Sequence, residues 1–182
     1  MTIKRYFLSL ILFFSLVVTA LAGGVGTWKN YLAYSDVQWV EEGSNKLYVL
    51  ASNSLYTYNK NDQSIKTYDK VNGLSDTDIR FIAWNKTARR LVIIYSNNNI
   101  DLLDDRGNVT NVPDYYLKTT MADKTVNGID MSGVYCYLST GFGLVKLNVA
   151  KAEISDSYNL SFPVNYSYIE GGYIYAASQS NG

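Results

Sequence analysis

The stretch Leu91-Val92-Ile93-Ile94-Tyr95 is an unbroken apolar run, and the turn-forming Asn97-Asn98-Asn99 comes shortly after it. An apolar run of this length, rich in β-branched residues, predicts a buried β-strand. Asn tolerates positive φ at little steric cost, so the three Asn residues favour a tight turn into a second strand over residues 100–103.

The same pattern recurs along the chain. Equivalent apolar runs begin at residues 47, 91, 134 and 174, so their starts lie 44, 43 and 40 residues apart. An innermost strand is expected to open each unit, near residues 37–40, 79–84, 126–130 and 166–169. A weaker and more polar outer strand is expected to close each complete unit, near residues 65–68, 109–112 and 153–157.

Four strands that repeat every ~40–45 residues are the pattern of a propeller blade. A β-sandwich also has short strands and turns, but it does not require a fixed period. We therefore predict an all-β fold, an incomplete β-propeller with about three and a half four-stranded antiparallel blades. The inner strands are expected to be buried between neighbouring blades and the outer strand to face water. The fourth unit contains only its two inner strands before the sequence ends, so residues 23–182 are expected to be the N-terminal part of a propeller, truncated in its fourth blade.

Residues 1–22 have the features of a secretory signal peptide. A short basic start, Lys4-Arg5, precedes an apolar stretch over residues 6–20 and an A-x-A site at Ala20-Leu21-Ala22. The apolar stretch is close to the minimum length of a membrane span, so an uncleaved anchor is the alternative. The small-residue site favours cleavage, which predicts an exported mature chain that begins at Gly23, has no membrane span and lies in the periplasm or at the cell surface.

Charge excludes one class of partner. Cleavage would change the balance from 16 basic and 16 acidic residues to 14 basic and 16 acidic ones, and no run of Lys or Arg interrupts the mature sequence. A nucleic-acid partner requires a concentrated basic face, so we expect no nucleic acid to bind.

The residue types also argue against catalysis. Histidine is absent from the sequence, which removes the commonest general base near neutral pH and the commonest transition-metal ligand. Cys136, the one cysteine, is interpreted as an apolar strand residue, with a reactive thiol as the alternative. We therefore predict that the protein is not an enzyme, and we expect no catalytic residues, no cofactor and no metal site; a polysaccharide lyase built on a propeller is the enzymatic alternative.

Two short motifs admit a ligand-binding interpretation. Asp101, Asp104 and Asp105 could hint at calcium, but their spacing fits no EF-hand loop, and residues 104–108 are interpreted as a turn between strands. Gly141-Phe142-Gly143 lacks the third glycine and the following helix of a nucleotide loop, and it is interpreted as a hairpin turn.

Six tyrosines alternate along the predicted strands: Tyr48, Tyr56, Tyr58, Tyr95, Tyr135 and Tyr137. Packing within and beside the blades is the favoured role, and stacking on sugars of a glycan is the alternative. The sequence assigns no individual ligand-binding residue.

Two segments carry a resemblance to a known family. Residues 68–79, Tyr-Asp-Lys-Val-Asn-Gly-Leu-Ser-Asp-Thr-Asp-Ile, resemble the inter-blade signature of two-component-regulator-type propellers. Together with residues 95–101, Tyr-Ser-Asn-Asn-Asn-Ile-Asp, they are most similar to the N-terminal propeller of PorZ-like proteins of Bacteroidota. The resemblance covers most of residues 28–182. It implies a surface component of type IX secretion that is associated with anionic lipopolysaccharide, and it supplies no catalytic motif.

The leading functional hypothesis is therefore a non-catalytic cell-envelope propeller that binds a protein or a surface glycan such as lipopolysaccharide, in type IX secretion or surface assembly. The alternative is the periplasmic sensor propeller of a hybrid two-component regulator. The sequence that follows the propeller would discriminate between them, because a sensor continues into a membrane helix and a kinase.

Overall fold

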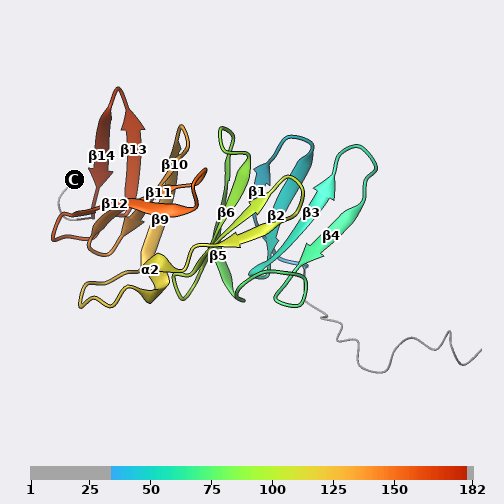
Figure 1. Ribbon diagram of the computed structural model, residues 1–182, viewed down its shortest axis with the longest axis horizontal. Helices are drawn as coiled ribbons and strands as arrows, with labels where there is room; N and C mark the ends of the chain where they lie inside the picture. Colours follow the sequence, from blue (N-terminus) through green and yellow to red (C-terminus); the bar gives the residue numbers. More distant parts are fainter. Residues whose placement is uncertain (1–33, 180–182) are drawn as a thin grey trace, which may run out of the picture. The chain divides into compact units, whose positions relative to one another are not determined.

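The computed structural model describes residues 34–179; the predicted signal peptide and its cleavage site lie outside these residues. Within them the chain forms three four-stranded antiparallel sheets and one two-stranded sheet (Figure 1). The spatial order of the strands in each sheet follows their order in the sequence, so each sheet is a simple meander of hairpins. The predicted fold, an incomplete propeller of four-stranded antiparallel blades, is confirmed.

Each sheet is one blade. Blade one consists of β1 (Val37–Glu42), β2 (Lys46–Ala51), β3 (Ser54–Asn59) and β4 (Ile65–Tyr68). Blade two consists of β5 (Ile79–Asn85), β6 (Arg90–Tyr95), β7 (Ile100–Asp104) and β8 (Val109–Asn111). Blade three consists of β9 (Val126–Ser132), β10 (Tyr135–Thr140), β11 (Gly143–Asn148) and β12 (Glu153–Asn159). Blade four contains β13 (Tyr166–Glu170) and β14 (Tyr173–Ala177).

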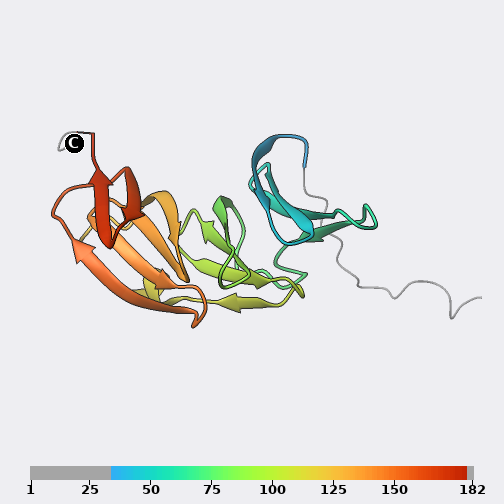
Figure 2. The ribbon, with the colours of Figure 1, turned by 90° about the horizontal axis from the view of Figure 1, so that it is seen from above.

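The blades succeed one another through their innermost strands. β1 contacts β5, β5 contacts β9, and β9 contacts β13, and Figure 2 shows the same succession of sheets from a second direction. One helical turn, α2 (Asp114–Leu117), interrupts the connection from blade two to blade three, and the sequence analysis did not anticipate it. No helix within residues 34–179 is long and apolar enough to cross a membrane.

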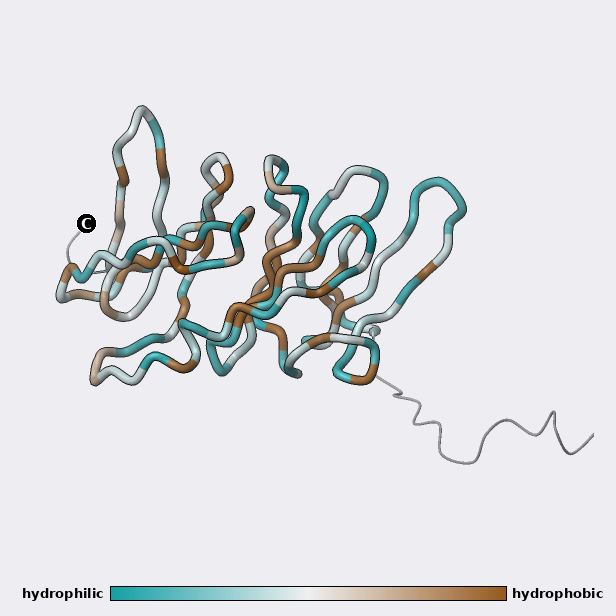
Figure 3. Tube along the Cα trace, in the orientation of Figure 1, coloured by the Kyte–Doolittle hydropathy of each residue, from teal (hydrophilic) through white to brown (hydrophobic). Residues whose placement is uncertain are grey.

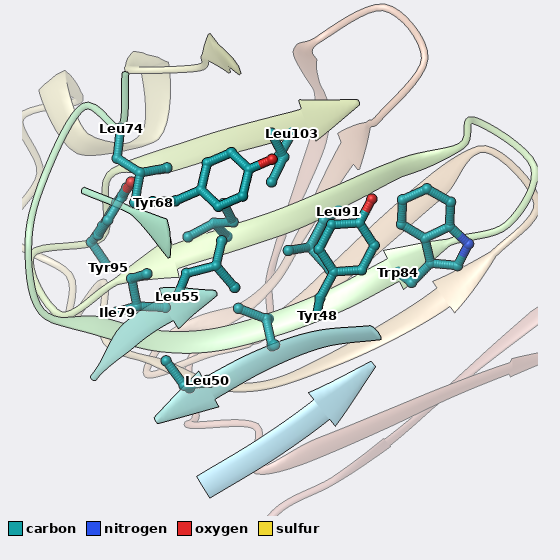
Figure 4. Packing of buried hydrophobic residues seen from close by; sticks show 12 residues of the cluster. Tyr48, Leu50, Leu55, Tyr68, Leu74, Ile79, Trp84, Leu91, Tyr95 and Leu103 are labelled. Atoms are coloured by element: carbon teal, nitrogen blue, oxygen red, sulfur yellow. The ribbon is translucent and has the colours of Figure 1, made fainter. Parts of the chain in front are cut away.

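Two hydrophobic clusters fill the spaces between blades. The first lies between blades one and two and includes Tyr48, Leu55 and Trp84, and the second lies between blades two and three. Figure 4 shows side chains of the first cluster. Leu91, Ile93 and Tyr95 of β6 belong to the first cluster, whereas Val92 and Ile94 belong to the second. The apolar run is therefore unbroken because both faces of β6 are buried.

Hydrophobic residues concentrate in the strands and hydrophilic residues in the hairpin ends (Figure 3). The innermost strand of blade one departs from the expected burial. Val37, Trp39 and Val40 of β1 are 50–56% exposed, whereas residues 91–95 of β6 are fully buried. β6 has a blade on each side, while among the described residues β1 has a neighbouring blade only toward β5, so its apolar side chains are covered on one side.

The innermost strands share an irregularity. The register of β1, β5 and β9 slips by one residue near the start of each strand, which leaves Gln38, Arg80 and Asn127 as the extra residues. A β-bulge of this kind turns the extra side chain away from the regular alternation. The amide of Gln38 is hydrogen-bonded to Asn53 in the turn between β2 and β3, and Asn127 donates to the carbonyl of Val164. The repeat thus extends from strand spacing to the position of a bulge.

Candidate functional site

Cys136 is the second residue of β10, fully buried and without a disulfide. Burial is the main cause that raises the pKa of its thiol, and the nearby carboxylate of Asp130 raises it further. A thiol held protonated is a poor nucleophile. The interpretation as a packed strand residue is confirmed.

The three aspartates considered for calcium have three separate environments. The Asp104 carboxylate accepts hydrogen bonds from the backbone N–H groups of Arg106 and Asn108, at 2.9 and 2.8 Å, which closes the turn. Burial alone would raise the pKa of Asp104, but hydrogen bonds, first those from Asn108, lower it below its ordinary value. Asp105 instead forms an ion pair with Arg89, with 2.6 Å between Nη2 and Oδ2. The turn interpretation of residues 104–108 is confirmed, and within residues 34–179 no group of three His, Cys, Asp or Glu side chains is placed to hold a metal.

Asp101 has a role that the sequence analysis missed. Its carboxylate is fully buried in β7 and accepts hydrogen bonds from the Tyr95 hydroxyl at 2.6 Å, the Ser75 N–H at 2.8 Å and the Asn111 amide at 2.9 Å. Burial, followed by the hydrogen bond to Asp101, raises the pKa of Tyr95. Since Ser75 belongs to the segment between blades one and two, this carboxylate fastens the inter-blade segment to blade two.

Carboxylates also join consecutive innermost strands. Glu41 of β1 accepts a hydrogen bond from the Trp84 N–H of β5 at 3.0 Å, and Asp130 of β9 accepts one from the Ile169 N–H of β13 at 3.2 Å. Glu41 and Asp130 occupy equivalent places, because each pairs with a tyrosine seven residues later in its hairpin. Between blades two and three, Asn85 donates to the Gly133 carbonyl at 3.0 Å. We call these contacts the inter-blade ties.

The tyrosines divide into two groups. Tyr48, Tyr95 and Tyr137 are buried, as the packing interpretation expects, and the Tyr48 ring stacks on Trp84 with centroids 5.2 Å apart (Figure 4). The other three, Tyr56, Tyr58 and Tyr135, are half-buried. Among residues 34–179, the most exposed tyrosines lie on β13 and β14 and were not singled out from the sequence: Tyr166, Tyr168, Tyr173 and Tyr175.

A cavity of about 400 Å³ lies between the α2 connection and blade three, and we call it the blade-three cavity. The connection contributes Asp114, Tyr115, Lys118, Thr120, Ala122 and Lys124 to its lining. Blade three contributes Phe142, Val145, Ile154, Ser157 and Asn159. The predicted hairpin turn at residues 141–143 is confirmed, and its Phe142 forms part of the cavity wall.

Comparison with known proteins identifies the family. The family described as "TSS9, PorZ, N-terminal beta-propeller domain" matches residues 47–182. The chain belongs to the PorZ N-terminal propeller family. No curated protein matches it.

Solved structures agree with this assignment. The structure of PorZ from Porphyromonas gingivalis, described as an essential bacterial surface component of the type IX secretion system, is 37% identical with a TM-score of 0.71. The match covers 76% of this chain and 19% of PorZ, so the chain spans about a fifth of that protein.

More distant structures share the fold alone. The extracellular domain of the putative one-component system BT4673 from B. thetaiotaomicron is 17% identical with a TM-score of 0.61, over 82% of this chain and 21% of that one. Apo AztD from Citrobacter koseri is 14% identical with a TM-score of 0.58, over 78% of this chain and 40% of that one.

Proposed function

We propose that this chain is a non-catalytic cell-envelope propeller that binds a protein or a surface glycan within type IX secretion. The observation that carries the proposal is the PorZ family match over residues 47–182, together with 37% identity to a surface component of that secretion system. We also propose that residues 1–22 are a cleaved signal peptide and that residues 23–182 are the N-terminal part of the propeller.

The architecture suits binding rather than chemistry. The carboxylates described above stabilise the scaffold. Asp101 holds the inter-blade segment, Glu41 and Asp130 join consecutive blades, and Asp104 closes a turn. A packed scaffold of this kind presents the loops at its hairpin ends to a partner. The partner class is therefore another envelope protein or a glycan such as lipopolysaccharide.

A sensor propeller of a two-component regulator is the competing function. It rests on a likeness of fold at 17% identity to BT4673, whereas the likeness to PorZ is at 37%. The higher identity favours a role in secretion, because loops and surfaces diverge faster than the scaffold that carries them.

Deleting the gene in the source bacterium tests the proposal. We expect type IX cargo to accumulate in the periplasm and to return to the surface when the full-length gene is restored. Normal cargo at the surface, with altered transcription of a defined gene set, would instead establish the sensor function. N-terminal sequencing of the exported protein tests the cleavage site, and a retained Met1 would contradict it.

A further inference from the structure

The wall of the blade-three cavity is held in place by a lysine. Lys124 Nζ donates hydrogen bonds, each of 2.9 Å, to the carbonyls of Tyr115, Tyr116 and Lys118. In return the Tyr115 hydroxyl donates to the Lys124 carbonyl at 2.6 Å. These bonds close residues 115–124 into a compact loop, so the connection forms a preorganised wall rather than a loose crossover.

The opposite wall is shaped by a bulge. Ile154 pairs with Leu147 and Asp156 pairs with Lys146, so Ser155 is an extra residue in β12. In a regular strand, residues three apart face opposite sides of the sheet. The extra residue brings Ile154 and Ser157 to the same side, and both line the cavity.

The chemistry of the lining favours an apolar occupant. Phe142, Val145 and Ile154 supply apolar surface from blade three. The three N–H groups of the Lys124 ammonium are already donated to carbonyls, so it has no donor left for a ligand, and the other two charged residues in the lining, Asp114 and Lys118, have opposite signs. A charged ligand of either sign would therefore meet both an attractive and a repulsive side chain, whereas an uncharged apolar group would meet the apolar surface of blade three.

Exposed apolar residues on the connection indicate that the occupant belongs to a protein. Tyr116, Leu117 and Met121, all on the connection that forms the wall, are 45%, 66% and 106% exposed. Tyr and Met are enriched at protein interfaces, and exposed apolar residues close together on a surface segment mark such sites. β12 is also the outer strand of blade three and has a partner strand on one side only, so an extended segment could lie along it.

We propose that the blade-three cavity binds one large apolar side chain, such as Phe, Leu or Met, from an extended segment of a partner protein. This inference rests on the proposed binding function. It narrows the class of partner at this surface from a protein or a glycan to a protein. The exposed apolar residues of the connection then pack against the partner segment, while the cavity holds the anchoring side chain.

The test is saturation-transfer NMR on the full-length protein with N-acetyl-L-phenylalaninamide and N-acetyl-L-leucinamide as probes. Methyl β-D-glucopyranoside serves as the sugar probe. We expect ring and methyl signals from the two amides and none from the glucoside. The variant Ser157→Trp, which places an indole at an exposed lining position, should reduce the amide signals by about fivefold or more. The control Ser155→Trp changes the neighbouring exposed serine, which does not line the cavity, and should retain them.

A second pair of variants covers the opposite wall and guards against a misfolded first variant. Thr120→Trp should reduce the amide signals, whereas Thr119→Trp, at an exposed position outside the lining, should not. The inference would be overturned if each cavity variant gave the same amide signals as its control. It would also be overturned by a glucoside signal that is lost only in the cavity variants. Either result leaves the secretion proposal standing, because that proposal depends on where cargo accumulates in the deletion strain.

Discussion

Replacement of Asp101 by Asn should loosen the segment between blades one and two. The buried carboxylate accepts three hydrogen bonds, of 2.6, 2.8 and 2.9 Å. An Asn side chain has nearly the same shape but only one carbonyl oxygen, so its NH₂ group must face at least one of the donors of Tyr95, Ser75 and Asn111. Burying an unsatisfied donor and losing a hydrogen bond to a charged group together cost about 2–3 kcal/mol.

Hydrogen exchange followed by mass spectrometry on the full-length protein measures this cost locally. A loss of about 2–3 kcal/mol corresponds to exchange that is about 30- to 150-fold faster in peptides covering residues 69–79. The control is Asp62→Asn, because Asp62 also accepts hydrogen bonds, from the N–H and hydroxyl of Ser64, but in an exposed turn of blade one. The control should leave residues 69–79 unchanged.

The reasoning would be refuted if residues 69–79 exchanged at the wild-type rate in Asp101→Asn. Another refuting result is an equal acceleration in Asp62→Asn. Either result would mean that packing of Leu74 and Ile79 alone holds the inter-blade segment, since both are buried in the first cluster.

Two substitutions and one labelling experiment probe the scaffold further. Gly143→Ala should destabilise blade three by roughly 1–3 kcal/mol and lower its melting temperature, because φ is +144° and a Cβ would lie 2.1 Å from the Tyr158 carbonyl oxygen; an unchanged melting curve would contradict this. Glu41→Ala should leave the Trp84 N–H without its 3.0 Å partner and cost about 1 kcal/mol, and faster hydrogen exchange at the start of blade two would report it, with wild-type exchange as the contrary result. The Cys136 peptide should resist N-ethylmaleimide in the native protein and react only after denaturation, because the thiol is fully buried; rapid native labelling would show that blade three opens readily.

The strand order and spacing could be read from the sequence because they depend on local composition. Unbroken apolar runs such as residues 91–95 predicted strands covered on both faces, and the Asn- and Gly-rich turns between them predicted the hairpins. The turn at residues 104–108 could also be predicted, because an Asp followed by Gly and Asn closes a turn with its own side chain.

The features that depend on distant pairs could not be predicted. Asp101 lies in the strand predicted over residues 100–103 and was considered only as a calcium ligand, and only the fold brings it against Ser75, 26 residues earlier. The blade-three cavity combines residues 114–124 with residues 142–159. Its shape depends on a bulge in β12 that the residue types there do not predict. The exposure of Val37, Trp39 and Val40 likewise follows from which strands have neighbours, not from their own hydrophobicity.

The inter-blade ties bear on how such a chain could gain units over time. Glu41 and Asp130 each reach a main-chain N–H of the following blade, and a main-chain N–H is present whatever side chain the following blade carries at that place. A duplicated blade would therefore carry its own carboxylate, and almost any following blade would offer it a main-chain N–H to bind. Tandem duplication could lengthen the array without a second, compensating substitution, which makes the number of repeats easier to change than the sequence within one.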